Sequence, residues 1–195
     1  MPECASLPAA YFEAKYAADP DPWQFGSSDY EARKYAATLA ALPGIRFERA
    51  LEAGCSIGVL TALLAERCDA LLAFDVAEIA LVQARIRNSD HPHVRIERRS
   101  LPRDWPTGTF DLMVFSEVLY YLDRADLLRV AAATRGGLSL DGAVLLVHWL
   151  GPTDYSLTGD AASELFIGAL ADVCSVTRSE RKLEYRLDLL VRRAA

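Results

Sequence analysis

The sequence predicts an α/β fold with a doubly wound, mostly parallel sheet of seven strands and an antiparallel hairpin at its C-terminal end. From residue 49 to Trp149, short apolar runs alternate with amphipathic stretches of helical length, and strands joined by helical crossovers lie parallel. After Leu150 the alternation stops, because the last two β-like runs leave no room for a helix between them. That spacing predicts the closing hairpin.

The expected strands are short and apolar, and the almost continuous apolar run Phe110–Phe115 is typical of a buried central strand. In chain order the strands are Ala50–Ala53, Ala70–Phe74, Val94–Glu97, Phe110–Phe115, Ala143–Trp149, Val173–Arg178 and Glu184–Val191. Amphipathic stretches predict the main helices near residues 57–66, 77–87, 124–136 and 162–171.

The N-terminal segment has a different pattern. The stretch Leu7–Tyr16 predicts a short helix, and the two prolines of Asp19–Trp23 predict an extended turn after it. Asp29 is the expected N-cap of a second helix, Tyr30–Leu42, which ends at Pro43-Gly44.

Length and charge limit the classes of function. A chain of 195 residues predicts one globular unit, with residues 1–44 as a helical cap or lid and residues 45–195 as the sheet domain. There are 21 Lys and Arg against 27 Asp and Glu, a net charge of −6. This acidic balance argues against nucleic acid or an anionic membrane as a partner and favours a small molecule.

Targeting and metal signals are missing from the sequence. The N-terminus has no basic segment followed by an apolar run, and no apolar stretch reaches the roughly 18 residues of a membrane span. The four cysteines show no Cys-x-x-Cys spacing and no histidine at ligand spacing. We therefore expect a cytoplasmic protein with no metal, while the oligomeric state cannot be inferred from the sequence.

The strongest local motif is Glu52-Ala53-Gly54-Cys55-Ser56-Ile57-Gly58, between the first strand and a helix. Small residues let the backbone approach a ligand closely, and the helix start offers unpaired N–H groups. The glycine spacing differs from the dinucleotide fingerprint Gly-x-Gly-x-x-Gly. The motif thus favours a ligand without phosphates.

Asp75 ends the second expected strand, 17 residues beyond Gly58. In open α/β sheets, a carboxylate at this place accepts the hydroxyls of a ribose. The alternative is that Asp75 only caps the helix that begins near Val76-Ala77. The two roles are compatible.

A second group of polar residues follows the fourth and fifth strands. Ser116-Glu117 emerges at the carboxyl end of the strand Phe110–Phe115, and the fifth strand brings His148-Trp149 to the same edge. Glu117 and His148 are therefore expected to converge on one pocket as catalytic residues. The alternatives are a solvated loop carboxylate and a structural histidine.

The N-terminal segment also holds aromatic residues beside a cation. Its residues fit a lid over the crevice, with Arg33 reaching a ligand carboxylate. The alternative is packing by Trp23 and Phe25 and a surface ion pair for Arg33. The residues concerned are Trp23, Phe25, Tyr30, Arg33 and Tyr35.

The glycine motif also spells Gly-x-Ser-x-Gly, the nucleophile elbow of α/β-hydrolases. Only one strand precedes Ser56, and no oxyanion loop of the His-Gly-Gly-Gly kind is present. A triad would need His148 together with Asp123 or Asp126 at a helix start. The context thus argues against a serine hydrolase.

Taken together, these residues resemble the S-adenosylmethionine-dependent methyltransferases of the Rossmann-like class, and within them those similar to nodulation protein S (NodS), an N-methyltransferase of chitooligosaccharide backbones. The resemblance runs through most of the chain. It is carried by Tyr11-Phe12, Asp19-Pro20-Asp21-Pro22-Trp23, Tyr30-Glu31-x-Arg33-Lys34-Tyr35, Leu51-Glu52-x-Gly54-Cys55-Ser56-Ile57-Gly58 and Ser116-Glu117-Val118-Leu119-Tyr120-Tyr121.

The resemblance implies a Rossmann-like methyltransferase fold and S-adenosylmethionine as the cofactor, with S-adenosylhomocysteine as the product. The glycine motif would line the methionine and ribose end, Asp75 would hold the ribose hydroxyls, and Arg33 would meet the carboxylate. Ser100 stands where the class often has an acidic residue for the adenine. The implied cofactor residues are Trp23, Arg33, Glu52, Gly54, Cys55, Ser56, Gly58, Asp75, Val76, Ser100, Leu101 and Ser116.

For the acceptor, the resemblance favours N-methylation of a small or sugar-derived amine. Glu117 would bind or deprotonate the amine, His148 would shape its pocket, and Tyr120, Tyr121 and Trp149 would contact it. O-methylation of a small metabolite, a serine hydrolase using Ser56, and a nucleotide-binding module without turnover remain as alternatives.

Overall fold

A computed structural model describes residues 5–194, and its contacts group them into two units. Residues 8–100 form the first unit, and residues 5–7 with 101–194 form the second. Seven strands make a mixed sheet, so the predicted α/β fold class with its C-terminal antiparallel strands is confirmed. No helix within residues 5–194 combines the length and the apolar character needed to cross a membrane.

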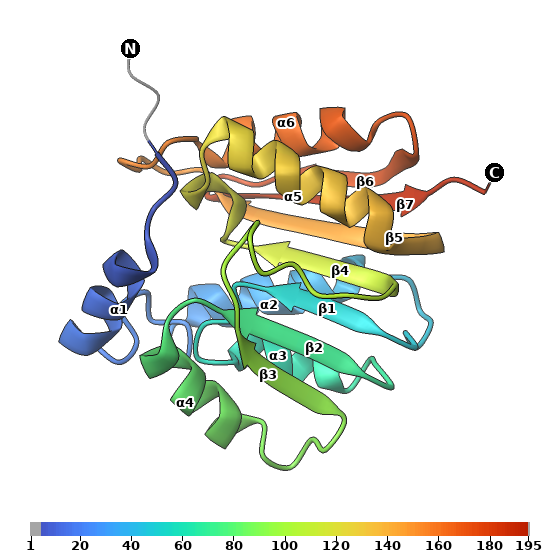
Figure 1. Cartoon of the computed structure of the whole chain (residues 1–195). Coiled ribbons are helices and arrows are strands. Elements are labelled where there is room, and N and C mark those ends of the chain that lie inside the picture. Colours follow the sequence, from blue (N-terminus) through green and yellow to red (C-terminus); the bar gives the residue numbers. More distant parts are fainter. Residues whose placement is uncertain (1–4, 195) are drawn as a thin grey trace. The chain divides into compact units, whose positions relative to one another are not determined.

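The first unit contains three parallel strands in the order β3-β2-β1, seen in cyan to green in Figure 1. Ala50 pairs with Leu71, and Asp75 pairs with Arg98. The elements are α1 (Ala9–Ala18), α2 (Asp29–Ala41), β1 (Ala50–Ala53), α3 (Val59–Ala65), β2 (Leu71–Asp75), α4 (Glu78–Arg87) and β3 (Val94–Arg98).

The two N-terminal helices belong to the first unit. Helix α1 packs against α4, and α2 packs against α3. The segment expected as a cap is therefore not set apart by its contacts, and its action as a lid stays a prediction. Residues 1–4 of that segment lie outside the described residues.

The cap of α2 differs from the prediction by one residue. Ser28 has extended backbone angles, and its hydroxyl accepts the N–H of Tyr30 at 3.2 Å. Asp29, the predicted N-cap, is instead the first helical residue, where a carboxylate interacts favourably with the helix dipole. The prediction was wrong because both Ser and Asp are good N-caps, and their order alone does not choose between them.

The second unit pairs β4 and β5 in parallel and continues with β7 and β6 as antiparallel strands. Figure 1 shows α5 and α6 side by side along these strands. The elements are β4 (Phe110–Ser116), the 3-10 helix η1 (Leu119–Tyr121), α5 (Arg124–Gly137), β5 (Leu138–Trp149), α6 (Gly159–Leu170), β6 (Cys174–Arg181) and β7 (Tyr185–Arg192).

Several boundaries in this unit differ from the expected ones, and two of them are the starts of β5 and α6. Strand β5 begins at Leu138, directly after α5, and not at Ala143. Helix α6 begins at Gly159 because the Thr158 hydroxyl accepts the N–H of Ala161 and so caps the helix. Both differences lie at element ends, which sequence patterns define least well.

The core of the second unit is formed by β4, whose residues Leu112, Met113, Val114 and Phe115 are all buried. This burial on both faces explains the almost continuous apolar run in the sequence. Because β4 is buried, the residues at its carboxyl end are held in defined positions.

Candidate cofactor and acceptor sites

The loop after β1 has a backbone that glycine makes possible. Gly58 has φ +77°, and a Cβ added there would lie 2.9 Å from the Cα of Ala84 in α4. Ser56 has φ +51°, which is uncommon for a residue with a side chain. The loop is therefore held in one conformation by its surroundings.

Asp75 fastens this loop to the end of β2. Its Oδ2 accepts the N–H of Ser56 at 2.9 Å, and its Oδ1 accepts the N–H of Ala77 at 3.0 Å. Burial raises the pKa of the Asp75 carboxyl, and the hydrogen bonds from Ala77 and Ser56 oppose that shift. Because α4 begins only at Glu78, Asp75 supports the turn before the helix and is not its N-cap.

Glu52 and Cys55 lie inside the fold. The Glu52 side chain is 2% exposed and accepts a 2.6 Å hydrogen bond from the Thr61 hydroxyl in α3. Burial raises the pKa of Glu52 to about 7. Burial also raises the pKa of the Cys55 thiol, with Asp75 and Glu52 adding to the shift, so this thiol stays protonated and unreactive.

Trp23 packs beside the loop. Its ring meets Tyr16 edge to face at 5.5 Å and stacks on Phe25 at 5.7 Å, next to Ile57 and Ala77. The packing alternative for Trp23 is thus observed. Tyr16 belongs to this cluster, and sequence reasoning missed it because it is part of no motif.

Arg33 has an exposed side chain in α2 and makes no hydrogen bond or ion pair to any residue in 5–194. The surface ion pair considered as its alternative is absent from that part of the chain. Its guanidinium is therefore available to a ligand carboxylate.

The remaining predicted cofactor residues lie in loops or at strand ends. The carbonyl of Val76 accepts a 3.1 Å hydrogen bond from Arg98, and Ser100 follows β3 with a partly buried side chain. Leu101 and Ser116 belong to the second unit, Ser116 as the last residue of β4.

Glu117 is the residue that follows β4, and its backbone is in the left-handed region at φ +55°. Its Oε2 accepts the Tyr120 hydroxyl at 2.6 Å and the backbone N–H of Trp149 at 2.8 Å. The structure therefore brings together three predicted residues from two separate segments. A strained backbone at such a place is typical of a functional site.

Three tyrosines pack together, and one of them, Tyr120, is bonded to this carboxylate. Tyr120 and Tyr121 meet edge to face at 4.7 Å, and Tyr155 stacks on Tyr120 at 5.4 Å and meets Tyr121 at 4.7 Å. Burial raises the pKa of Tyr120 and Tyr121 well above the usual value, so both phenols stay neutral. Sequence reasoning missed Tyr155 because it lies in an irregular loop between β5 and α6.

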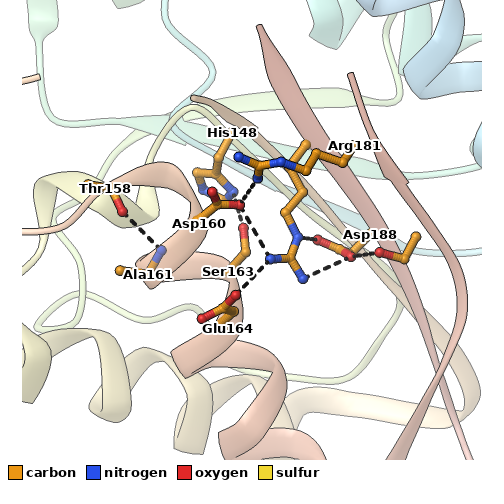
Figure 2. A network of polar contacts seen from close by, with 10 residues as sticks. His148, Thr158, Asp160, Ala161, Ser163, Glu164, Arg181 and Asp188 are labelled. Atoms are coloured by element: carbon orange, nitrogen blue, oxygen red, sulfur yellow. Dashed lines mark hydrogen bonds and ion pairs between the residues drawn. The ribbon is translucent and has the colours of Figure 1, made fainter. Parts of the chain in front are cut away.

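His148 lies near the end of β5, where its ring meets the Tyr120 ring edge to face at 5.4 Å. Its side chain is fully buried, and its Nε2 accepts the N–H of Leu119 at 3.3 Å. Its Nδ1 lies 3.3 Å from the Ser163 hydroxyl (Figure 2), so these partners assign the proton to Nδ1. The contacts are those of the structural alternative, and a catalytic role for His148 stays a prediction.

Helix α6, which carries Ser163, is joined to the hairpin by ion pairs (Figure 2). Asp160 pairs with Arg181 and Arg186, and Arg186 pairs with the fully buried Asp188 at 2.6 Å. This network fixes the support behind His148.

The hydrolase alternative does not agree with the loop. Among the described residues, the Ser56 hydroxyl has Tyr16 as its partner at 2.5 Å and no histidine. A serine nucleophile needs a base within hydrogen-bond distance. Ser56 therefore lacks the activation of a triad.

A methyltransferase fold accounts for these features. A candidate methyltransferase from Pseudomonas syringae is 42% identical and superposes with a TM-score of 0.75, covering 84% of this chain and 99% of that one. N-methyltransferase NodS from Bradyrhizobium japonicum, solved with S-adenosylhomocysteine, superposes with a TM-score of 0.80 at 21% identity over 94% and 97% of the two chains. The chain thus has the Rossmann-like fold of methyltransferases.

The family is narrower than the fold. The family model of nodulation protein S (NodS) matches residues 11–141. Nodulation protein S from Bradyrhizobium diazoefficiens is 33% identical over 74% of this chain, and that of Rhizobium tropici is 34% identical over 57%. The chain belongs to the NodS family. It spans 65% and 47% of the lengths of these two relatives.

Proposed function

We propose that this protein is an S-adenosylmethionine-dependent methyltransferase that transfers the methyl group to the nitrogen of a small or sugar-derived amine. Membership of the NodS family supports the reaction class. The NodS structure with S-adenosylhomocysteine supports the cofactor. The acceptor chemistry is argued from Glu117.

The first unit fits the cofactor. Its loop after β1 lies at the carboxyl end of a parallel strand, where open α/β sheets bind ligands. Asp75 supplies a carboxylate for the ribose hydroxyls, and Arg33 supplies a guanidinium for the carboxylate of the methionine part. Bound S-adenosylmethionine would supply a methyl group on a sulfonium sulfur, and the neutral thioether of S-adenosylhomocysteine would be the leaving group.

The other residues of the proposed cofactor site have lesser roles. Within the first unit, the adenine is proposed to lie near Val76 and Ser100, with no acidic residue at Ser100 to accept its amino group. Glu52 is proposed to support the loop from inside, because its carboxyl is bonded to Thr61 and buried. Trp23, Cys55 and Gly58 are proposed to shape the walls.

The single observation that carries N-methylation is the environment of Glu117. A carboxylate oxygen that accepts two hydrogen bonds is fixed in position, and a fixed carboxylate beside aromatic rings binds an ammonium well. An ammonium must lose a proton before its lone pair can react, and Glu117 is proposed to take it. A neutral hydroxyl gains less from this environment and needs a stronger base.

The test is methyl transfer to paired acceptors that differ only in the reacting group, such as glucosamine and glucose oligomers. We expect the methyl group on nitrogen, located by mass spectrometry of the product. Methylation of the hydroxyl members alone would refute the amine proposal and leave the O-methyltransferase alternative. Failure of all acceptors, with S-adenosylhomocysteine still bound, would favour the nucleotide-binding module.

A further inference from the structure

Helix α1 touches the loop after β1 through one pair of polar atoms. The Tyr16 hydroxyl lies 2.5 Å from the Ser56 Oγ, and the Tyr16 side chain is only 4% exposed. Ser56 in turn donates its backbone N–H to Asp75. A phenol from the N-terminal segment thus stands next to the loop and the carboxylate proposed to hold the cofactor.

Helix α1 also contacts the start of α4, and its Glu13 pairs with Arg98 at 3.3 Å. Glu13 accepts the backbone N–H groups of Glu78 at 2.9 Å and Ile79 at 3.4 Å. Helix α4 has no side-chain cap of its own, so Glu13 takes that role from a distant part of the chain. Two points, Glu13 and Tyr16, therefore fix α1 across the turn that follows Asp75.

The Tyr16 hydroxyl is not needed for packing. The ring lies among apolar groups, Ile57, Ala77, Ala80 and Trp23, which a phenylalanine would contact equally well. A phenolic hydroxyl both donates and accepts, and among the described residues it has Ser56 as its hydrogen-bond partner and no other. The Tyr16 hydroxyl can therefore make a further hydrogen bond beside Ser56.

Burial keeps the Tyr16 hydroxyl protonated, so it can donate a hydrogen bond. Burial raises the pKa of Tyr16 far above its usual value, and the nearby Asp75 adds to the shift. The phenol is therefore neutral throughout the physiological pH range and suited to a polar, uncharged or anionic ligand group.

We infer that Tyr16 is a further cofactor-binding residue, whose hydroxyl hydrogen-bonds a polar group of S-adenosylmethionine beside Asp75, with α1 as one wall of the site. This inference rests on the proposed function. It also gives the N-terminal segment a role in binding the cofactor, in addition to the predicted role as a lid.

The test is calorimetric titration of S-adenosylhomocysteine into wild type, Tyr16→Phe and the control Tyr11→Phe. Tyr11 lies on the same helix, where its ring meets Phe12 edge to face. A hydrogen bond of typical net strength predicts a Kd about 3- to 10-fold higher for Tyr16→Phe. Tyr11→Phe should stay within about twofold of wild type. Equal affinities for the two variants would overturn the inference.

A second pair of variants separates direct contact from support of Ser56. If Tyr16 touches the cofactor, Tyr16→Phe weakens binding also in a Ser56→Ala background, since the two hydroxyls act separately. If Tyr16 only holds Ser56, the second change costs no affinity, and the inference is overturned. Absence of binding by wild type would instead refute the proposed function, so the two failures are distinguishable.

Discussion

The proposed cofactor and acceptor regions are built in opposite ways. The centre of the cofactor region is a continuous stretch, Glu52 to Gly58, whose shape lies in the backbone and which the carboxylate of Asp75 supports. The acceptor region joins groups from three segments, represented by the Glu117 carboxylate, the backbone N–H of Trp149 and the Tyr155 ring. A site formed by consecutive residues can be recognised from one sequence motif. A site formed by groups from separate segments exists only in the folded chain.

If the two regions have separate roles, Glu117→Gln should lower the rate of methyl transfer and leave cofactor binding unchanged, and this is the largest effect that we expect. We expect kcat to fall about 100-fold or more, because general base catalysis typically contributes 10²- to 10⁴-fold. The Kd of S-adenosylhomocysteine, measured by calorimetry, should stay near the wild-type value. The exposed Glu184 gives a matched control as Glu184→Gln. Activity within a few-fold of wild type would remove Glu117 from the mechanism.

Removal of the cation beside Asp188 tests how far the acceptor region depends on its support. Arg186→Met leaves a fully buried carboxylate without its charge partner, and such a loss costs about 3 kcal/mol or more. Urea unfolding should show this drop in the free energy of unfolding. Arg181→Met, which breaks an exposed ion pair with Asp160, should cost at most about 1 kcal/mol. Equal effects of the two changes would show that the network is not a buried support.

The cofactor region should show its own signature in the pH dependence of stability. The folded-state pKa of Glu52, about 7, is higher than the usual value of 4.5. The folded protein thus retains a proton that the unfolded chain releases, and stability falls as pH rises from about 4.5 to 7. The cost is complete near pH 8 and amounts to about 3 kcal/mol.

Glu52→Gln should remove this dependence. The variant is expected to match wild type near pH 4 and to be more stable near pH 8 by up to about 3 kcal/mol, measured by urea unfolding at both pH values. For Glu184→Gln, on the surface, the difference from wild type in the free energy of unfolding should be the same at both pH values. A Glu52→Gln effect that does not change with pH would contradict the raised pKa.

The smallest effect is expected at Tyr155. Tyr155→Ala removes a ring that stacks on Tyr120, and the KM for the acceptor should rise about 3- to 10-fold, the range of one aromatic contact. Tyr155→Phe keeps the ring and should restore most of the affinity. S-adenosylhomocysteine binding should not respond to either change. A response in cofactor binding would show that the two regions are less separate than proposed.

Most of the fold follows from the periodicity of the sequence. The apolar runs predicted all seven strands, and the short spacing after Leu150 predicted the antiparallel end, because a parallel crossover needs a helix that does not fit there. Errors were confined to element ends, as at Ser28 and Leu138. There, one hydrogen bond or one tertiary contact decides the boundary.

The candidate site was only partly predictable. Glu117, Tyr120 and Trp149 converge as expected, because parallel strands end at the same edge. The burial of His148 was not predictable, since alternation along a strand end does not say which face is inside.

The sequence by itself determined the fold class, the loop with its glycines, and the family, because these are local patterns of polarity and backbone freedom. Only the tertiary structure decided that Tyr16 reaches Ser56, that Tyr155 joins Tyr120, and that His148 supports η1. Each of these contacts joins residues about 30 to 40 positions apart, and such pairs meet only after the packing of whole elements has placed them.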